Sequence, residues 1–159
     1  MAIEPLVINT GPLILLDKAG ALDVAGRLPF QIICPAAVRR ELDSGVAQGY
    51  PEIRPSWLQV ALLKNPVSPL IKAALDLGEA EVIELALENR YPHVCLDDLR
   101  GRRLAVAAGL RVVGVLGLLA TAKKHGIIGA IRPFTDRLLH AGAWYSPALV
   151  ARVLSDLGE

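Results

Sequence analysis

Two adjacent carboxylates, Asp97 and Asp98, follow a short apolar run and precede an arginine-rich stretch. The apolar run at residues 94–96 is typical of a buried strand, and residues 102–108 are typical of a helix. Carboxylate oxygens are ligands for hard cations such as Mg²⁺ or Mn²⁺, and arginine is well shaped to bind phosphate. This stretch therefore predicts a site for a divalent cation and a phosphate group.

Other acidic side chains are placed to reach the same edge of a sheet. In open α/β sheets, sites form beyond the carboxyl ends of the strands. Glu41 lies on a predicted helix that follows the second strand, whereas Glu79 and Glu81 open a helix that leads into the strand at residues 94–96. Crowded carboxylates repel one another unless a cation or a shifted protonation relieves them. We therefore expect these acids to converge around a metal ion.

Each of these residues also has a purely structural interpretation. Asp97 or Asp98 would serve equally to cap the helix that follows, and the glutamates would complement a positive helix end or pair with a neighbouring arginine. The hydroxyl of Thr10 would bind a metal-bound water or a phosphate oxygen, or would cap the first helix. The sequence leaves both interpretations open for each residue.

Strand-like and helix-like segments alternate along the chain, which predicts an α/β fold with a mostly parallel sheet. Strands are expected at residues 6–8, 30–34, 58–63 (an edge strand), 94–96 and 111–115, with a loop at residues 44–55. Helices are expected at residues 13–19, 21–28, 35–43, 69–77, 78–89, 102–108, 116–125, 130–140 and 147–157, the last capped by Ser146. We expect residues 1–159 to form one domain, with helices at about 130–157 packing on it or on a partner.

Composition narrows the class of protein. The formal net charge is +1, so any basic surface for nucleic acid must be local. Cys34 and Cys95 lie in strand-like runs and are expected to be buried thiols in a reducing compartment. No apolar run reaches the roughly 18 residues needed to span a bilayer, and no signal peptide is recognisable. We expect a soluble, cytoplasmic protein that does not bind membranes.

Five segments of the chain resemble the PIN-domain family of metal-dependent nucleases, and most closely its PIN-like branch of predicted nucleic-acid-binding proteins. They occur in the order of the family and span most of the chain. The segments are VINTGPLI at residues 7–14, PAAVRREL at 35–42, LGEAEVIELA at 77–86, LDDLRGRR at 96–103 and VGVLGLL at 113–119.

The resemblance implies a three-layer α/β/α domain with an acidic metal site that cleaves single-stranded RNA. By position, the family's metal-binding acids correspond to Asn9, Glu41, Glu81 and Asp98. Asp97 and Glu79 are close neighbours of these positions, and we include Asp97 among the expected metal-binding and catalytic residues. The expected substrate-binding residues are Thr10, at the hydroxyl position that follows the first acid, and Arg100, Arg102 and Arg103.

The same resemblance implies Mg²⁺ or Mn²⁺ as the cofactor and single-stranded RNA as the substrate. Many members of the family are toxins that pair with a small antitoxin protein, and many form homodimers. We therefore expect a toxin-like endoribonuclease that has both kinds of partner.

The chain departs from the family pattern at Asn9, where an amide stands in place of a carboxylate. An amide can still offer one oxygen to a metal, but the lost negative charge weakens cation binding. An alternative function is therefore a catalytically weak or inactive module that binds RNA or protein. A receiver-type signalling domain also uses acids at a sheet edge, but its acidic pair follows the first strand, where this chain has Asn9 and Thr10.

Overall fold

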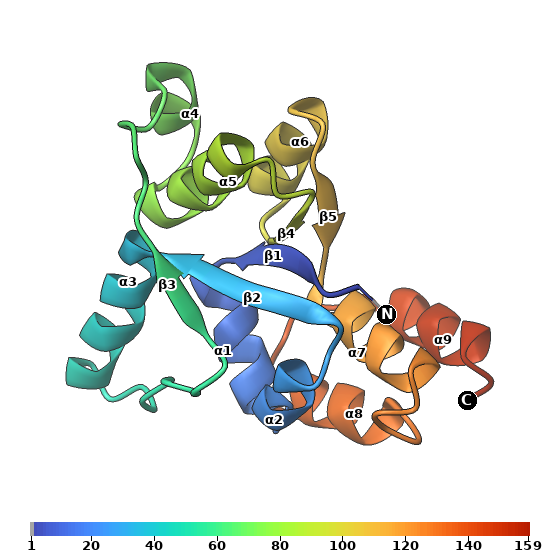
Figure 1. Cartoon of the computed structure of the whole chain (residues 1–159). Coiled ribbons are helices and arrows are strands. Elements are labelled where there is room, and N and C mark those ends of the chain that lie inside the picture. The colour runs from blue at the N-terminus through green and yellow to red at the C-terminus, as the bar shows by residue number, and fades with distance from the viewer. Residues whose placement is uncertain (1) are drawn as a thin grey trace.

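The computed structural model describes residues 2–159, which form a five-stranded parallel sheet between layers of helices (Figure 1). The strand order is β3-β2-β1-β4-β5, so β1 lies at the centre and β3 at one edge. The strands are β1 (Glu4–Ile8), β2 (Phe30–Pro35), β3 (Gln59–Ala61), β4 (His93–Cys95) and β5 (Arg111–Val113). The predicted α/β/α fold with a parallel sheet is confirmed, and the third strand lies at an edge as expected.

The helices flank the sheet in two layers. They are α1 (Thr10–Lys18), α2 (Leu22–Gly26), α3 (Ala36–Ala47), α4 (Pro69–Ala74), α5 (Leu77–Asn89), α6 (Leu99–Ala107), α7 (Val115–Lys124), α8 (Arg132–His140) and α9 (Pro147–Asp156). Figure 1 shows α4, α5 and α6 on one side of the sheet, and α1, α2, α7 and α8 on the other. Within these layers α5 packs on β1, β2 and β4, while α1 packs on α2, α7 and α8.

The core lies where the central strands meet these helices. Leu6, Val7 and Ile8 of β1 are fully buried, because a parallel sheet that is covered on both faces needs apolar residues in continuous runs. The inner face of α5 contributes Val82 and Ile83, which are also fully buried. Burial of these side chains holds the carboxyl ends of the strands, and the amino end of α5, in fixed positions.

The C-terminal helices pack against this same domain. Val150 and Leu154 of α9 are buried in the core cluster. The side chain of Glu159 accepts hydrogen bonds from the backbone N–H of Ile131 at 2.8 Å and from Lys123 Nζ at 2.9 Å. Ser146 caps α9 as expected, since its hydroxyl accepts a hydrogen bond from the N–H of Leu149.

Three helices extend by more than one residue beyond their predicted bounds. Helix α1 begins at Thr10, three residues before its predicted start at Leu13. Helix α3 continues to Ala47, into residues that were expected to form a loop. Arg39 pairs with Asp43 one turn later, and the Tyr50 ring covers the buried side of Gly45. Helix α6 begins at Leu99, three residues earlier than predicted, because Asp98 caps it. The early start places Arg100 and Arg103 on the first turns of α6, next to the carboxyl end of β4.

Cys34 and Cys95 are buried free thiols, as expected. Burial raises the pKa of Cys34 to about 11, so this thiol stays protonated at neutral pH. Among residues 2–159, no helix combines the length and the apolar character needed to cross a membrane.

Candidate active site

The parallel sheet gathers several polar side chains at one edge. Asn9 follows the end of β1, α3 follows the end of β2, and Asp98 follows β4 after two intervening residues. Helix α5 runs back toward the start of β4, so its first turn, which carries Glu79, lies at this same carboxyl edge. In open α/β sheets this edge is where ligands bind.

Glu41 of α3 is held at this edge by two neighbours. Its Oε2 accepts a hydrogen bond from the hydroxyl of Thr10 at 2.5 Å. Gly78 of α5 leaves room for the carboxyl group, since a Cβ at Gly78 would lie 3.0 Å from Glu41 Cδ. Glu41 does not pair with Arg39 or Arg40, which contact other acids. Thr10 therefore positions a carboxylate and does not cap α1, where the N-cap residue is Asn9.

Glu79 lies in the same cluster, and its pKa reports the crowding of negative charge. The pKa is raised from 4.5 to about 7, first by burial and then by the charges of Asp76, Asp98 and Glu41. A cation bound nearby would favour the ionised form and reverse the shift. Three acidic neighbours thus add to the raised pKa of Glu79, and no basic group is among the causes of the shift.

Asp76 is a site residue that the sequence analysis missed. It caps α5, and its carboxylate accepts a hydrogen bond from the N–H of Glu79 at 2.9 Å. The spacing Asp76-Leu77-Gly78-Glu79 is that of a capping box, which would have placed both acids at the helix start. Because Asp76 takes the cap position, the side chain of Glu79 faces the other acids of the cluster.

Asp98 has the capping role that the sequence allowed, and it also lies beside the other acids of this edge. Its Oδ2 accepts a hydrogen bond from the N–H of Gly101 at 3.0 Å, which caps α6. Gly101 lies close to both carboxyl groups, since a Cβ built there would be in ordinary contact with Glu79 Cδ at 3.8 Å and with Asp98 Oδ2 at 3.9 Å. Capping therefore holds Asp98 next to Glu79.

A cleft of about 720 Å³ opens beside these acids. Its walls combine the carboxylates of Asp76, Glu79 and Asp98 with the guanidinium groups of Arg100 and Arg103. Both arginines are exposed, and Arg100 makes only a long hydrogen bond of 3.5 Å to the carbonyl of Ala74. Guanidinium groups beside a cluster of carboxylates are arranged to bind a phosphate next to a cation.

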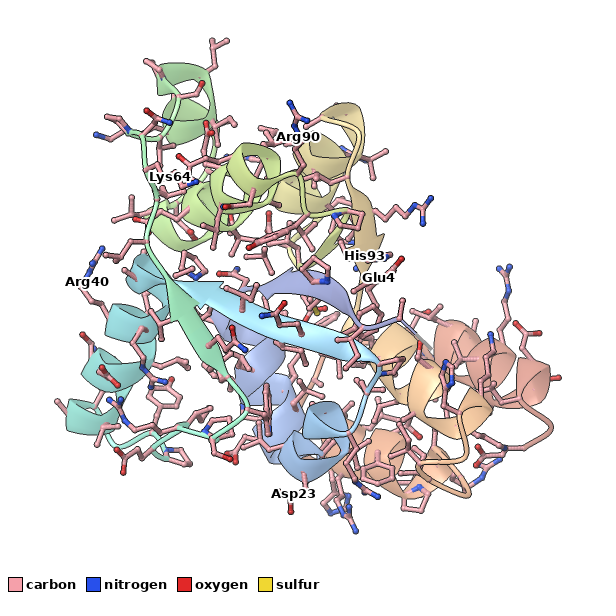
Figure 2. All side chains as sticks on the ribbon, in the orientation of Figure 1. Glu4, Asp23, Arg40, Lys64, Arg90 and His93 are labelled. Atoms are coloured by element: carbon pink, nitrogen blue, oxygen red, sulfur yellow. The ribbon has the colours of Figure 1, made fainter. Side chains whose placement is uncertain are left out.

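Glu81 faces a different neighbour from Glu79. Its Oε1 accepts a hydrogen bond from the backbone N–H of Ala37, at the start of α3, at 3.2 Å. Its Oε2 lies 3.8 Å from Arg40, which projects from α3 in Figure 2. The structure thus brings Glu79 to Glu41 and Asp98, while Glu81 contacts the amino end of α3.

Asp97 and Arg102 lie together on the far side of the turn that carries Asp98. Burial raises the pKa of Asp97, which Arg102 and a hydrogen bond from the N–H of Val115 lower in part. Arg102 donates a hydrogen bond to the carbonyl of Leu96 at 2.9 Å. These contacts hold the β4–α6 turn in shape, and they separate Arg102 from the exposed Arg100 and Arg103.

Asn9 carries a buried amide oxygen, Oδ1, that has no hydrogen-bond partner within residues 2–159. Its backbone N–H donates to the carbonyl of Cys95, which fixes it between the ends of β1 and β4. Such an oxygen is costly to leave unpaired in a protein interior. A bound cation or an ordered water would satisfy it.

His93 lies outside this site. It contacts Glu4 at the amino ends of β4 and β1, and Figure 2 shows this pair well away from Arg40 of α3. His93 is therefore not among the side chains at the carboxyl edge.

Comparison with protein families decides the identity of the fold. A family model described as a PIN domain matches residues 5–159. The chain belongs to the PIN-domain family. No curated protein and no solved structure matches it. The PIN domain is a nuclease-type fold whose members generally use divalent metals.

The oxygen donors at this edge of the PIN domain suit a divalent cation in their chemistry. Glu41, Glu79 and Asp98 offer carboxylate oxygens, and Asn9 adds an unpartnered amide oxygen. This all-oxygen set suits Mg²⁺ or Mn²⁺. Over residues 2–159, however, no three acidic, histidine or cysteine side chains are already grouped closely enough to hold a metal. Side-chain rotation is needed to complete a coordination shell.

The Thr10 hydroxyl is expected to orient Glu41 in this PIN domain. Thr10→Val keeps the shape of the side chain but removes the donor, so we expect metal affinity to fall about 10-fold, as for other residues that orient metal ligands. Thr10→Ser keeps the hydroxyl and should retain most of the affinity. Calorimetric titration with Mn²⁺ measures both variants, and equal loss in the two would contradict the role of the hydroxyl.

Proposed function

We propose that this PIN domain is a metal-dependent endoribonuclease that cleaves single-stranded RNA. The observation that carries the proposal is the cluster of Glu41, Glu79 and Asp98. The negative charges of Glu41 and Asp98 help to raise the pKa of Glu79. Two of these acids, Glu79 and Asp98, line an open cleft together with Asp76 and the exposed Arg100 and Arg103. Stability alone explains such an arrangement poorly. These side chains are suited to a cation and a phosphodiester.

Each residue has a distinct role in the proposal. Glu41, Glu79 and Asp98 hold Mg²⁺ or Mn²⁺, with Asn9 as a neutral oxygen donor. A divalent ion, when bound, lowers the pKa of a water and neutralises charge that builds up on the phosphate. Arg100 and Arg103 bind the RNA backbone, and Thr10 holds Glu41 in place. Asp97 and Arg102 support the turn on which Asp98 lies.

A second candidate function is a binding module of the same fold with little or no catalysis. Two observations favour it. Asn9 replaces a carboxylate and so removes one negative charge from the site, and the described residues contain no group of three acids that is ready to hold a metal. Such a module would bind RNA or a protein without a need for Mg²⁺ or Mn²⁺.

Cleavage of RNA in the presence and absence of metal separates these functions. Purified protein with Mn²⁺ is expected to cut unstructured single-stranded RNA, and EDTA should stop the reaction. Asp98→Asn should abolish cleavage, whereas Asp23→Asn should not, because Asp23 lies on the distant helix α2 (Figure 2). Cleavage that Asp98→Asn leaves intact comes from a contaminant, and absence of both cleavage and Mn²⁺ binding would favour the binding module.

A toxin-type role is part of the same proposal. An endoribonuclease of this kind would act in the cytoplasm as a homodimer and would be restrained by a small antitoxin protein. The support is the family to which the chain belongs. A gene for a small DNA-binding protein next to the gene for this chain would support the pairing, and harmless overproduction of the active enzyme would contradict it.

A further inference from the structure

A second hollow lies next to the acidic cleft. This groove has a volume of about 950 Å³ and lies between β5, the amino end of α7 and the segment that carries Trp144 and Tyr145. Asp98 and Leu99 line both the acidic cleft and this groove. An RNA strand that passes over Asp98 would therefore place one nucleotide at the cleft and its neighbour at the groove.

Trp144 is the most unusual residue of the groove. Its side chain is 100% exposed, although the rest of the groove wall includes the apolar residues Leu116, Leu149 and Val153. A tryptophan that is left in water is available to stack on a flat partner, and aromatic stacking on a nucleobase requires no particular base sequence. The exposure excludes the core-packing role that a tryptophan usually has.

The groove also offers polar groups without partners. Within residues 2–159, neither Asp97 Oδ2 nor the hydroxyl of Tyr145 has a hydrogen-bond partner, and both are shielded from solvent. Arg102 lies beside them and packs closely on Gly114, where a Cβ would lie 3.1 Å from Arg102 Nη1. The edge of a nucleobase carries N–H donors and carbonyl or ring-nitrogen acceptors, which would satisfy these groups once the side chains turn toward the groove.

We propose that this groove binds an unpaired nucleobase of single-stranded RNA, stacked on Trp144, while the adjacent phosphate lies in the acidic cleft. The inference rests on the proposed function for the kind of ligand, and it adds the base pocket to the site. The groove shares Asp98 and Leu99 with the cleft, and its lining includes the polar side chains of Asp97, Arg102 and Tyr145. Both features favour a nucleotide over an apolar segment of a protein.

Binding of labelled RNA, measured by fluorescence anisotropy in EDTA, tests this inference without any need for cleavage. Trp144→Ala is expected to weaken the binding of a short single-stranded RNA about 10-fold, which corresponds to the loss of one stacked base. Trp144→Phe should retain most of the affinity, because the ring is kept. Leu62→Ala is the matched control, since Leu62 is an exposed apolar residue outside both hollows.

Two comparisons make the test specific for stacking: binding at different salt concentrations, and binding of single-stranded against duplex RNA. The effect of Trp144→Ala should hardly change with salt concentration, whereas the effect of Arg103→Gln should shrink as salt rises. Trp144→Ala should not alter any binding of duplex RNA, because its bases are already stacked within the helix. Unchanged affinity for single strands in Trp144→Ala would overturn the inference.

Two further outcomes are decisive. If Trp144→Ala converts a dimer to a monomer in light scattering and leaves RNA affinity unchanged, a second copy covers the groove and the inference fails. If RNA binds through Trp144 but is never cleaved with Mn²⁺, the base pocket stands and the proposed nuclease activity fails. The two proposals are thereby tested apart from each other.

Discussion

Glu79→Gln and Glu41→Gln are each expected to slow RNA cleavage about 100-fold or more, whereas Glu81→Gln should retain most of the activity. Glu79 lies in the charged cluster with Glu41 and Asp98, so each change removes a carboxylate that would hold the cation, and the cation would neutralise charge on the phosphate. Glu81 instead accepts a hydrogen bond from Ala37 N–H. Initial rates at saturating Mn²⁺ provide the measurement.

Glu81→Gln should affect stability more than chemistry. Its carboxylate satisfies a backbone N–H in the first turn of α3 and approaches Arg40, so we expect the free energy of unfolding to fall by roughly 1 kcal/mol. Glu52→Gln is the control, because Glu52 is an exposed acid that contacts only the neighbouring Arg54 among the ion pairs. Loss of cleavage in Glu81→Gln with retained activity in Glu79→Gln would reverse our assignment of the two acids.

Affinity for Mn²⁺ is expected to rise steeply between pH 5.5 and pH 8. The pKa of Glu79 is about 7 in the folded protein, so at pH 5.5 this carboxyl group is protonated and a metal must displace the proton. One and a half pH units below the pKa, the displacement weakens affinity by about 30-fold. Calorimetric titration at the two pH values measures the change, and Glu79→Gln should bind weakly at both and lose most of the dependence.

The same group makes stability depend on pH when no metal is bound. Between pH 4.5 and pH 7 the folded protein holds a proton on Glu79 that the unfolded chain releases, so the free energy of unfolding falls as the pH rises through this window. Because the carboxyl group is partly exposed to water, we expect a loss of about 1 kcal/mol and not the full linkage value. Urea unfolding in EDTA compares the protein with Glu79→Gln, and parallel curves for the two would contradict the raised pKa.

Sequence patterns predicted correctly the helices and strands whose local signals agree with the surroundings they have in the folded protein. The continuous apolar runs of β1 and β2 predicted buried parallel strands, and Ser146 with Pro147 predicted the start of α9. The order of strands and helices then predicted which ends meet at the carboxyl edge. Errors occurred at helix boundaries, such as the first turn of α6, which Asp98 caps, and the last turn of α3, where Tyr50 packs against Gly45.

The amino acid sequence by itself determined the α/β fold, the edge of the sheet that carries the site, and the presence of Glu41 and Asp98 there, because strand order and polarity follow from local patterns. Only the tertiary structure decided which of Glu79 and Glu81 lies beside Asp98. They are two residues apart on α5 and therefore point in different directions, one toward Asp98 and the other toward α3. It also added Asp76 to the cluster and separated Arg102 from Arg100 and Arg103. Such choices depend on which side chains meet across elements, and spacing along the chain does not fix them.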